Sequence, residues 1–412
     1  MRFRSVYPGW PVATGCFLGV FVMFGLSYSF GVFLTPIQQD LDLARSGVSL
    51  IFSLQTGVVY VAAAALGIAA DRFGVRRMLA FGMIAFLAGV VLTVVVRSFA
   101  AFLIAYGVVT AVGLSAIYVV SYATVPRWFE RRRGLATGLA TSGLGVGMFA
   151  IPPAAEVLIR LLGWREALLF IAICATAGLV VATLLIRDSP AGLESDVDLS
   201  GEFPDGYAEM EPFDRASYRA ELWAIATSRR FRFVFAGWIG VYATMYVVFV
   251  HLVAHAGELG VGERAGVIAL AVIGVTTGFA RIAVGWLSDR VGRFRTFLAC
   301  SAAMAAATLA LPAVDSRIGL LAFAVAFGAA YGGNGALLSP LTADLFGRAN
   351  PNAVFGLVSL SFAVSGVLAP WGAGLIYDLQ GSYTLAFLLA GAIGLVGSGL
   401  VWLSGMQPAA AR

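Results

Sequence analysis

One arginine stands inside a long apolar segment, where a charge is costly. Arg281 lies six residues before the end of the apolar run 265–287, and insertion scales put an arginine at a helix centre at ~2.5–3.5 kcal/mol. Its neighbours Thr276, Thr277 and Gly278 include no acid that could neutralise it. A guanidinium binds a carboxylate through two parallel hydrogen bonds. We therefore expect Arg281 to bind an anion. Two alternatives are that it reaches toward the membrane interface or caps backbone carbonyls of a neighbouring helix.

Polar side chains in two other apolar runs could complete such a site. Tyr118 and Tyr122 are spaced i,i+4, and Tyr331 and Asn334 are spaced i,i+3, so each pair shares a helix face. Phenol hydroxyls and an amide suit the hydroxyl, keto or carboxylate oxygens of an organic acid. The alternative is that these groups only hydrogen-bond between helices. Apolar walls could come from three phenylalanines, which would otherwise be packing residues: Phe30, Phe33 and Phe362.

Titratable chemistry elsewhere is sparse. His251 and His255 are the only histidines and lie one turn apart. A histidine titrates near neutral pH, so His251 is a candidate proton relay; the two could also bind zinc, but no third ligand is evident, and packing is the remaining alternative. The sequence has no phosphate-binding Walker loop, no Ser/His/Asp set and no metal-ligand cluster. We expect neither an enzyme, nor ATP-driven pumping, nor a metal or cofactor.

The elements that must position these residues are membrane-spanning helices. Of the 412 residues, 60% are hydrophobic and 12% are charged, against ~25% charged in soluble domains. A helix needs ~20 apolar residues to cross the hydrocarbon core. Runs of that length occur at residues 11–35, 48–70, 78–96, 99–122, 134–155, 164–186, 231–255, 265–287, 296–314, 319–341, 354–376 and 383–403. The first run has no small-residue cleavage site, so we expect a retained helix rather than a signal peptide.

The charge distribution indicates an orientation. All 27 basic residues are arginines. If the N-terminus is cytoplasmic, the inner loops and termini hold twenty of them and the outer loops hold six. An excess of arginine in short inner loops is the positive-inside signature, so the net charge of +5 reflects topology and not nucleic-acid binding. We expect a multi-pass protein of the cell membrane with both termini cytoplasmic.

The chain divides into two similar parts. The longest polar segment, 187–230, follows the sixth apolar run and predicts a cytoplasmic linker between an N-terminal half, 1–186, and a C-terminal half, 231–412; within it, 214–227 could form an amphipathic helix at the membrane surface. The pattern G-x-x-x-D-R-x-G follows the second run of each half, at 67–74 and again 218 residues later at 285–292. Its fixed positions are Gly67, Asp71, Arg72 and Gly74, then Gly285, Asp289, Arg290 and Gly292. Two six-helix repeats are a known transporter architecture.

This repeated pattern resembles the signature of the major facilitator superfamily. Two further stretches, YSFGVFLTPIQQDL at 28–41 followed by RSGVS at 45–49, and WFERRRGLATG at 128–138, look like the monocarboxylate porter family, whose relatives include oxalate/formate exchangers. The resemblance implies an all-α membrane protein with twelve transmembrane helices in two six-helix halves. It also implies a substrate-binding arginine in the eighth helix, which matches Arg281, and gating by the repeated loops.

The sequence departs from the family pattern in ways that bear on the substrate. Animal-type members carry an Asp one turn before the arginine, where this chain has Thr277, and a first-helix Lys that has no counterpart here. Oxalate exchangers have a second cation in the eleventh helix, whereas the matching stretch FGLVSLSF at 355–362 is neutral. Since a dicarboxylate in a dry cavity needs more than one positive charge, one arginine favours a monoanion.

We therefore expect a secondary active transporter of small monocarboxylates such as lactate or pyruvate, coupled to protons and working by alternating access. Its partners would be the monocarboxylate anion, a proton and the lipid bilayer. The alternatives are an organic-anion antiporter of the oxalate/formate type, an exporter of other small molecules, and a non-transporting sensor on a transporter fold.

Overall fold

The protein is built from helices long enough to cross a membrane. The computed structural model describes residues 7–42, 45–129, 132–188, 215–347 and 350–406. These are nearly all helical, and twelve of their helical segments have the length and apolar composition of membrane spans. The predicted twelve-helix membrane fold is confirmed. Each observed span overlaps its predicted run, and their ends differ by at most seven residues.

Several spans consist of more than one helical piece. The fourth span, Phe99–Trp128, contains four pieces, with a π-helix as the second, and the fifth span, Arg133–Leu162, contains two. The pieces and the remaining helices up to the linker are α1 (Gly9–Asp40), α2 (Arg45–Phe73), α3 (Val75–Val95), α4 (Phe99–Phe102), η1 (Leu103–Thr110), α5 (Ala111–Ala123), α6 (Val125–Trp128), α7 (Arg133–Thr141), α8 (Gly143–Leu162) and α9 (Trp164–Leu185). The later helices are α10 (Arg215–Thr227), α11 (Arg229–Glu258), α12 (Glu263–Val291), α13 (Arg293–Ala310), η2 (Leu311–Ala313), α14 (Arg317–Phe346), α15 (Pro351–Gln380) and α16 (Thr384–Gly405).

The last glycine of each repeated motif ends a helix. Gly74 has a φ of 90° between α2 and α3, and Gly292 has a φ of 103° between α12 and α13. These are conformations that residues with a side chain rarely adopt, so glycine permits the sharp reversal from one helix into the next. We call the end of the bundle that carries Gly74 and Gly292 the motif end.

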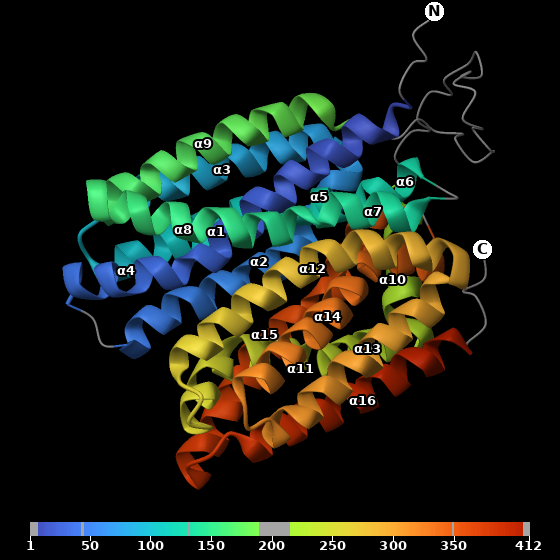
Figure 1. The fold of residues 1–412 in the computed structure, drawn as a ribbon. Coiled ribbons are helices and arrows are strands. Elements are labelled where there is room, and N and C mark those ends of the chain that lie inside the picture. The colour runs from blue at the N-terminus through green and yellow to red at the C-terminus, as the bar shows by residue number, and fades with distance from the viewer. Residues whose placement is uncertain (1–6, 43–44, 130–131, 189–214, 348–349, 407–412) are drawn as a thin grey trace, which may run out of the picture.

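The helices form two groups, which we call the N-terminal half (α1 to α9) and the C-terminal half (α11 to α16). Figure 1 shows the blue-to-green helices of the first beside the yellow-to-red helices of the second. The halves meet where α2 packs on α15 and where α12 packs on α7 and α8. The division at 186/187 and 230/231 stays a prediction. Residues 189–214 of the predicted linker, Glu130 and Arg131 of the WFERRRGLATG stretch, and both chain ends lie outside the described residues.

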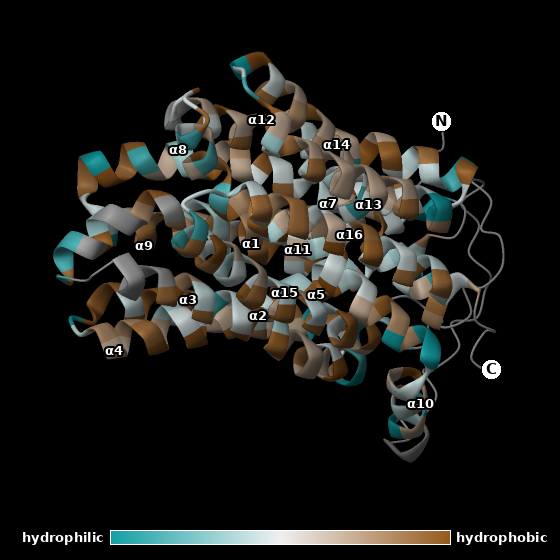
Figure 2. Ribbon diagram, turned by 90° about the horizontal axis from the view of Figure 1, so that it is seen from below, coloured by the Kyte–Doolittle hydropathy of each residue, from teal (hydrophilic) through white to brown (hydrophobic). Residues whose placement is uncertain are grey.

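The linker helix α10 is amphipathic. Tyr218, Leu222 and Ile225 are buried at a spacing of four and then three residues, whereas Trp223 on another face is 73% exposed. Figure 2 shows α10 set off from the bundle, and it packs on α11 and α15. The expected amphipathic helix is therefore present. Its position at a membrane surface stays a prediction.

Candidate functional site

Arg281 is a cation buried inside the helix bundle. Its side chain is 1% exposed and lies in α12. Nη1 donates a hydrogen bond to the Tyr122 hydroxyl at 3.3 Å, and the guanidinium carbon lies 5.8 Å from the ring centroid of Tyr331. Nε has no partner, and no acidic side chain pairs with Arg281 in the part of the chain that the structure describes. Because a buried charge without compensation is costly, this geometry leaves a place for an anion.

The residue one turn before Arg281 is a threonine that connects two helices. Thr277 is 1% exposed and donates its hydroxyl to the backbone carbonyl of Gly328 at 3.2 Å, so it ties α12 to α14. Its hydroxyl is thus used between helices. The threonine contributes no negative charge to the guanidinium.

Arg281 lines a small cavity between the two halves, which we call the central cavity. Its volume is about 20 Å³, enough for about one water molecule, which needs ~10–15 Å³ on this measure. The cavity is lined by Phe24, Tyr28, Tyr60, Tyr118, Tyr122, Tyr242, Met245, Arg281, Tyr331, Gly335, Leu338 and Phe362. These residues come from α1, α2 and α5 of the N-terminal half and from α11, α12, α14 and α15 of the C-terminal half. The structure is therefore a nearly closed state, with the site shared between the halves.

The three tyrosines predicted for the site, Tyr118, Tyr122 and Tyr331, line this cavity with Arg281. Tyr122 holds the guanidinium, and the ring centroid of Tyr118 lies 5.0 Å from that of Tyr122, as their i,i+4 spacing predicts. The Tyr118 hydroxyl also lies 3.2 Å from the Ser359 hydroxyl in the opposite half. Tyr331 supplies the ring beside Arg281. The guanidinium thus contacts α5 and α14, and Tyr118 connects α5 to α15.

Asn334 is placed behind the wall of the central cavity, not in it. Its amide nitrogen donates to the Ser301 hydroxyl at 2.5 Å, and its amide oxygen accepts a hydrogen bond from the Tyr242 hydroxyl. Asn334 is fully buried and does not line the cavity. It therefore positions the cavity residue Tyr242.

His251 lies away from the central cavity. Its Nε2 is 3.0 Å from the backbone carbonyl oxygen of Pro370, and it follows Tyr242 by nine residues on α11, which is ~13 Å along a helix axis. His255, one turn further, lies 3.2 Å from the Glu258 carboxylate. The two histidines stabilise contacts at the end opposite the motif end. A role of His251 in proton relay stays a prediction.

Several cavity residues were not predicted from the sequence, chiefly Tyr28, Tyr60 and Gly335. The 218-residue repeat does hold a signal for Tyr60: it maps Arg281 onto Ala63, so residues near Ala63 should lie at the same depth. Of the three phenylalanines proposed as walls, Phe362 lines the cavity. Phe30 instead packs on Phe52 and Tyr106, and Phe33 is buried elsewhere.

The aspartates of the two motifs cap helices of the opposite half. The Asp71 carboxylate accepts hydrogen bonds from the amide side chain of Asn352 at 2.6 Å and from the backbone nitrogen of Ala353 at 2.8 Å, at the start of α15. Asp289 accepts from the backbone nitrogens of Gly134 at 2.9 Å and Leu135 at 3.0 Å, at the start of α7. Carboxylates are stabilised at helix N-termini by free N–H groups and the helix dipole.

The motif glycines bring the halves into backbone contact. A Cβ on Gly67 would lie 2.8 Å from the carbonyl carbon of Asn352, and one on Gly285 would lie 3.0 Å from that of Gly134. The partners of both motif positions are also separated by 218 residues. The two contacts thus repeat one another across the halves. Arg72 and Arg290 are exposed, over the rings of Phe73 and Trp286 respectively.

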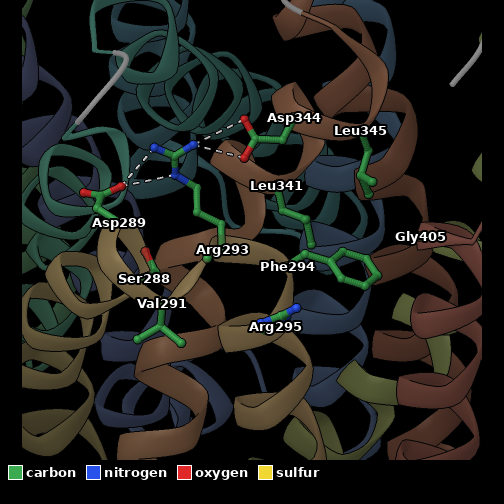
Figure 3. Close-up of a pocket in the computed structure, with 11 residues that line it drawn as sticks. Ser288, Asp289, Val291, Arg293, Phe294, Arg295, Leu341, Asp344, Leu345 and Gly405 are labelled. Carbon is green, nitrogen blue, oxygen red and sulfur yellow. Dashed lines mark hydrogen bonds and ion pairs between the residues drawn. The ribbon is translucent and has the colours of Figure 1, made fainter.

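An ion-pair network adds to the second motif. Figure 3 shows Arg293 between two carboxylates, with Nη2 2.9 Å from Asp289 and Nη1 3.1 Å from Asp344. Arg133 of α7, which is 1% exposed, also pairs with Asp344. Asp289, Arg293 and Asp344 border a cavity of about 550 Å³ at the motif end, which is larger than the central cavity. The network joins the halves at the motif end.

Comparisons with known proteins cover nearly the whole chain. The family model described as Major Facilitator Superfamily matches residues 16–315 and 256–412. Monocarboxylate transporter 13 of Bos taurus is 28% identical over 407 residues, which cover 97% of this chain and 91% of the relative. Monocarboxylate transporter 12 of Rattus norvegicus is 25% identical over 93% of this chain and 82% of the relative.

Solved structures show the same fold at low identity. The E. coli fucose:proton symporter superposes with a TM-score of 0.74 at 16% identity, over 97% of this chain and 99% of that one. A human organic anion transporter superposes with a TM-score of 0.72 at 15% identity, over 96% and 99%. At such identities the likeness concerns the arrangement of helices alone.

Proposed function

The chain belongs to the major facilitator superfamily, and on that premise we propose that it is a proton-coupled transporter of small monocarboxylate anions such as lactate or pyruvate. The predicted resemblance to monocarboxylate transporters is confirmed by the curated relatives. The chain is therefore a multi-pass membrane transporter rather than an enzyme. The substrate, the coupled ion and the orientation are the proposal.

The observation that carries the proposal is Arg281. A guanidinium that is 1% exposed, with one hydrogen bond to a neutral hydroxyl and an unpartnered Nε, is incomplete as a structural element. A substrate carboxylate would accept two parallel hydrogen bonds and supply the missing negative charge. The alternative, that the Arg281 side chain extends to the membrane interface, does not suit a side chain with so little exposed surface.

Alternating access would involve two regions where the halves meet: the central cavity and the helix caps at the motif end. The central cavity draws its lining from both halves, so a relative movement of the halves opens it at one end or the other. The caps at Asp71 and Asp289 close the motif end. Release toward the motif end would require these caps to break, and this makes them candidates for the rate-limiting contacts.

The proposed coupling to protons rests on charge. Moving one net charge against 100 mV costs ~2.3 kcal/mol, and a proton moving with a monoanion cancels that cost. No acidic side chain lines the central cavity among the described residues. The proton would travel on the substrate carboxylate or through a group such as His251. By the positive-inside rule, the arginine-rich motif end lies on the cytoplasmic side of the cell membrane, and both termini lie on that side.

Uptake into proteoliposomes tests the proposal. Labelled lactate uptake should be driven by an acidic exterior and should not respond to a potassium–valinomycin potential at constant pH, because the coupled step moves no net charge. Liposomes without protein and Arg281→Ala liposomes are the controls. Uptake driven by the potential and indifferent to the pH gradient would refute proton symport. Absence of carboxylate uptake under every gradient would refute the transport proposal itself.

A further inference from the structure

The walls of the central cavity are mostly aromatic rings. Eight of its twelve lining residues are phenylalanine or tyrosine. Resting on the proposed function, we infer that the site prefers monocarboxylates with a flat aromatic body, such as arylcarboxylates, over small aliphatic acids. The carboxylate would bind Arg281, and the aromatic ring would lie among the rings of the two halves.

Three of the six tyrosines in this wall use their hydroxyls in contacts within the protein. Tyr118 bonds with Ser359, Tyr122 accepts from Arg281, and Tyr242 donates to Asn334. Tyr118 and Tyr242 therefore offer a substrate mainly their ring surface, which suits the flat face of an aromatic acid.

Ring contacts also close the cavity between the halves. Tyr60 of α2 and Phe362 of α15 have centroids 5.2 Å apart. Tyr122 of α5 stacks on Phe355 of α15 at 5.6 Å with an interplanar angle of 10°. These values lie in the ~4.5–7 Å range of favourable aromatic pairs. Ring-on-ring contacts of this kind leave the central cavity only about 20 Å³.

Opening the cavity must separate some of these rings. An aromatic substrate placed between the halves replaces each lost ring contact with a new one, whereas lactate leaves the rings facing water or a void. Two further lining residues add to this preference. Tyr331 presents its ring to Arg281 at 5.8 Å, and Met245 supplies a thioether, a group that packs well on ring edges. The cavity thus combines one cation with a polarisable, ring-lined space.

A matched panel of acids separates aromatic recognition from size. Calorimetry on the purified full-length protein would compare benzoate, cyclohexanecarboxylate and lactate at one pH. Benzoate and cyclohexanecarboxylate have the same carboxylate and ring size, but only benzoate is flat and aromatic. We expect benzoate to bind about tenfold more tightly than either, the ratio that two ring contacts of ~0.7 kcal/mol each would give.

The outcomes distinguish this inference from the proposed function. Benzoate binding no more tightly than cyclohexanecarboxylate, while lactate or either ring acid binds, overturns the aromatic preference and leaves carboxylate transport standing. Binding of none of the three acids contradicts the proposed function. Phe362→Leu should lower the benzoate-to-cyclohexanecarboxylate ratio, whereas Phe86→Leu, a buried phenylalanine outside the cavity, should not. An unchanged ratio in folded Phe362→Leu would also count against the inference, and the wild-type panel decides it if that variant does not fold.

Discussion

Gly335 gives the Arg281 guanidinium its place in the central cavity. A Cβ on Gly335 would lie 2.8 Å from the guanidinium carbon, whereas Cβ atoms on the neighbouring Gly332 and Gly333 would meet other groups. The obstructed group is the far end of a flexible side chain, so the chain can relieve the clash by moving the guanidinium. An added methyl at 335 would therefore disturb the site more than the fold.

We predict that Gly335→Ala weakens carboxylate binding by ~10- to 100-fold, the value of one misplaced hydrogen bond to a charged group. The thermal unfolding temperature should change little. Gly399→Ala on α16, where a Cβ would meet nothing within 4 Å, is the control. Isothermal titration with lactate and benzoate measures the effect. Wild-type affinity in Gly335→Ala would show that the guanidinium needs no such space.

Individual residues of the site could be predicted where a charged or polar side chain interrupts an apolar run. A guanidinium and phenol hydroxyls inside apolar runs are conspicuous, and Arg281, Tyr118, Tyr122 and Tyr331 all line the cavity. The sequence predicted the depth of Asn334 in the membrane. It could not predict that Asn334 lies behind Tyr242, because that position depends on how α11, α13 and α14 pack.

At the scale of helices, the motif aspartates act on helix ends far away in the sequence. Asp71 bonds to the start of α15 and Asp289 to the start of α7, each in the opposite half. In this structure both bonds join the two halves at the motif end. We expect loss of either bond to change the balance between conformations that are closed and open at the motif end, and to leave the substrate site unchanged.

We predict that Asp71→Asn lowers the maximal transport rate more than it changes substrate affinity. A charge-assisted hydrogen bond of ~1.5–3 kcal/mol corresponds to a ~10- to 100-fold shift between closed and open states. Asp378→Asn, an exposed acid also on α15, controls for loss of charge. The rate and the half-saturation concentration are measured in proteoliposomes at equal protein. If the rate is unchanged, Asp71 serves only to fix topology.

The sequence predicted the helices and the repeat better than the contacts between them. Length and hydropathy identify each span, because the bilayer sets both. The 218-residue repeat shows that Asp71 and Asp289 are equivalent. The sequence could not predict the hydrogen-bond partners of these aspartates, because Ala353 and Gly134 donate from the backbone and their positions depend on the packing of the halves.

For the whole molecule, the distribution of charge limits the substrate. Arg281 is the one cationic side chain that lines the central cavity in the described ranges, and the stretch of α15 beside it, 355–362, is neutral. A second carboxylate would enter this space without a partner. Desolvating an unpaired charge costs several kcal/mol.

We therefore predict that oxalate and succinate compete poorly with monocarboxylates. In a labelled-lactate uptake assay, each dianion should need at least ~100-fold higher concentration than unlabelled lactate for half-inhibition, the equivalent of ~3 kcal/mol. Formate, which carries one charge and is smaller than oxalate, controls for size. Oxalate inhibiting as strongly as lactate would instead favour an antiporter of the oxalate/formate type.

The central claim is that Arg281 binds the substrate carboxylate, and its most direct test is the affinity of position-281 variants. Arg281→Ala and Arg281→Lys should both lose ~2–5 kcal/mol of binding free energy, about 30- to several-thousand-fold. Lysine keeps the charge but lacks the planar fork. Arg160→Ala, at an exposed arginine of α8, is the control. Affinities for lactate and benzoate are measured by calorimetry on folded protein. The account predicts that both variants fail together; wild-type affinity in Arg281→Ala would contradict it.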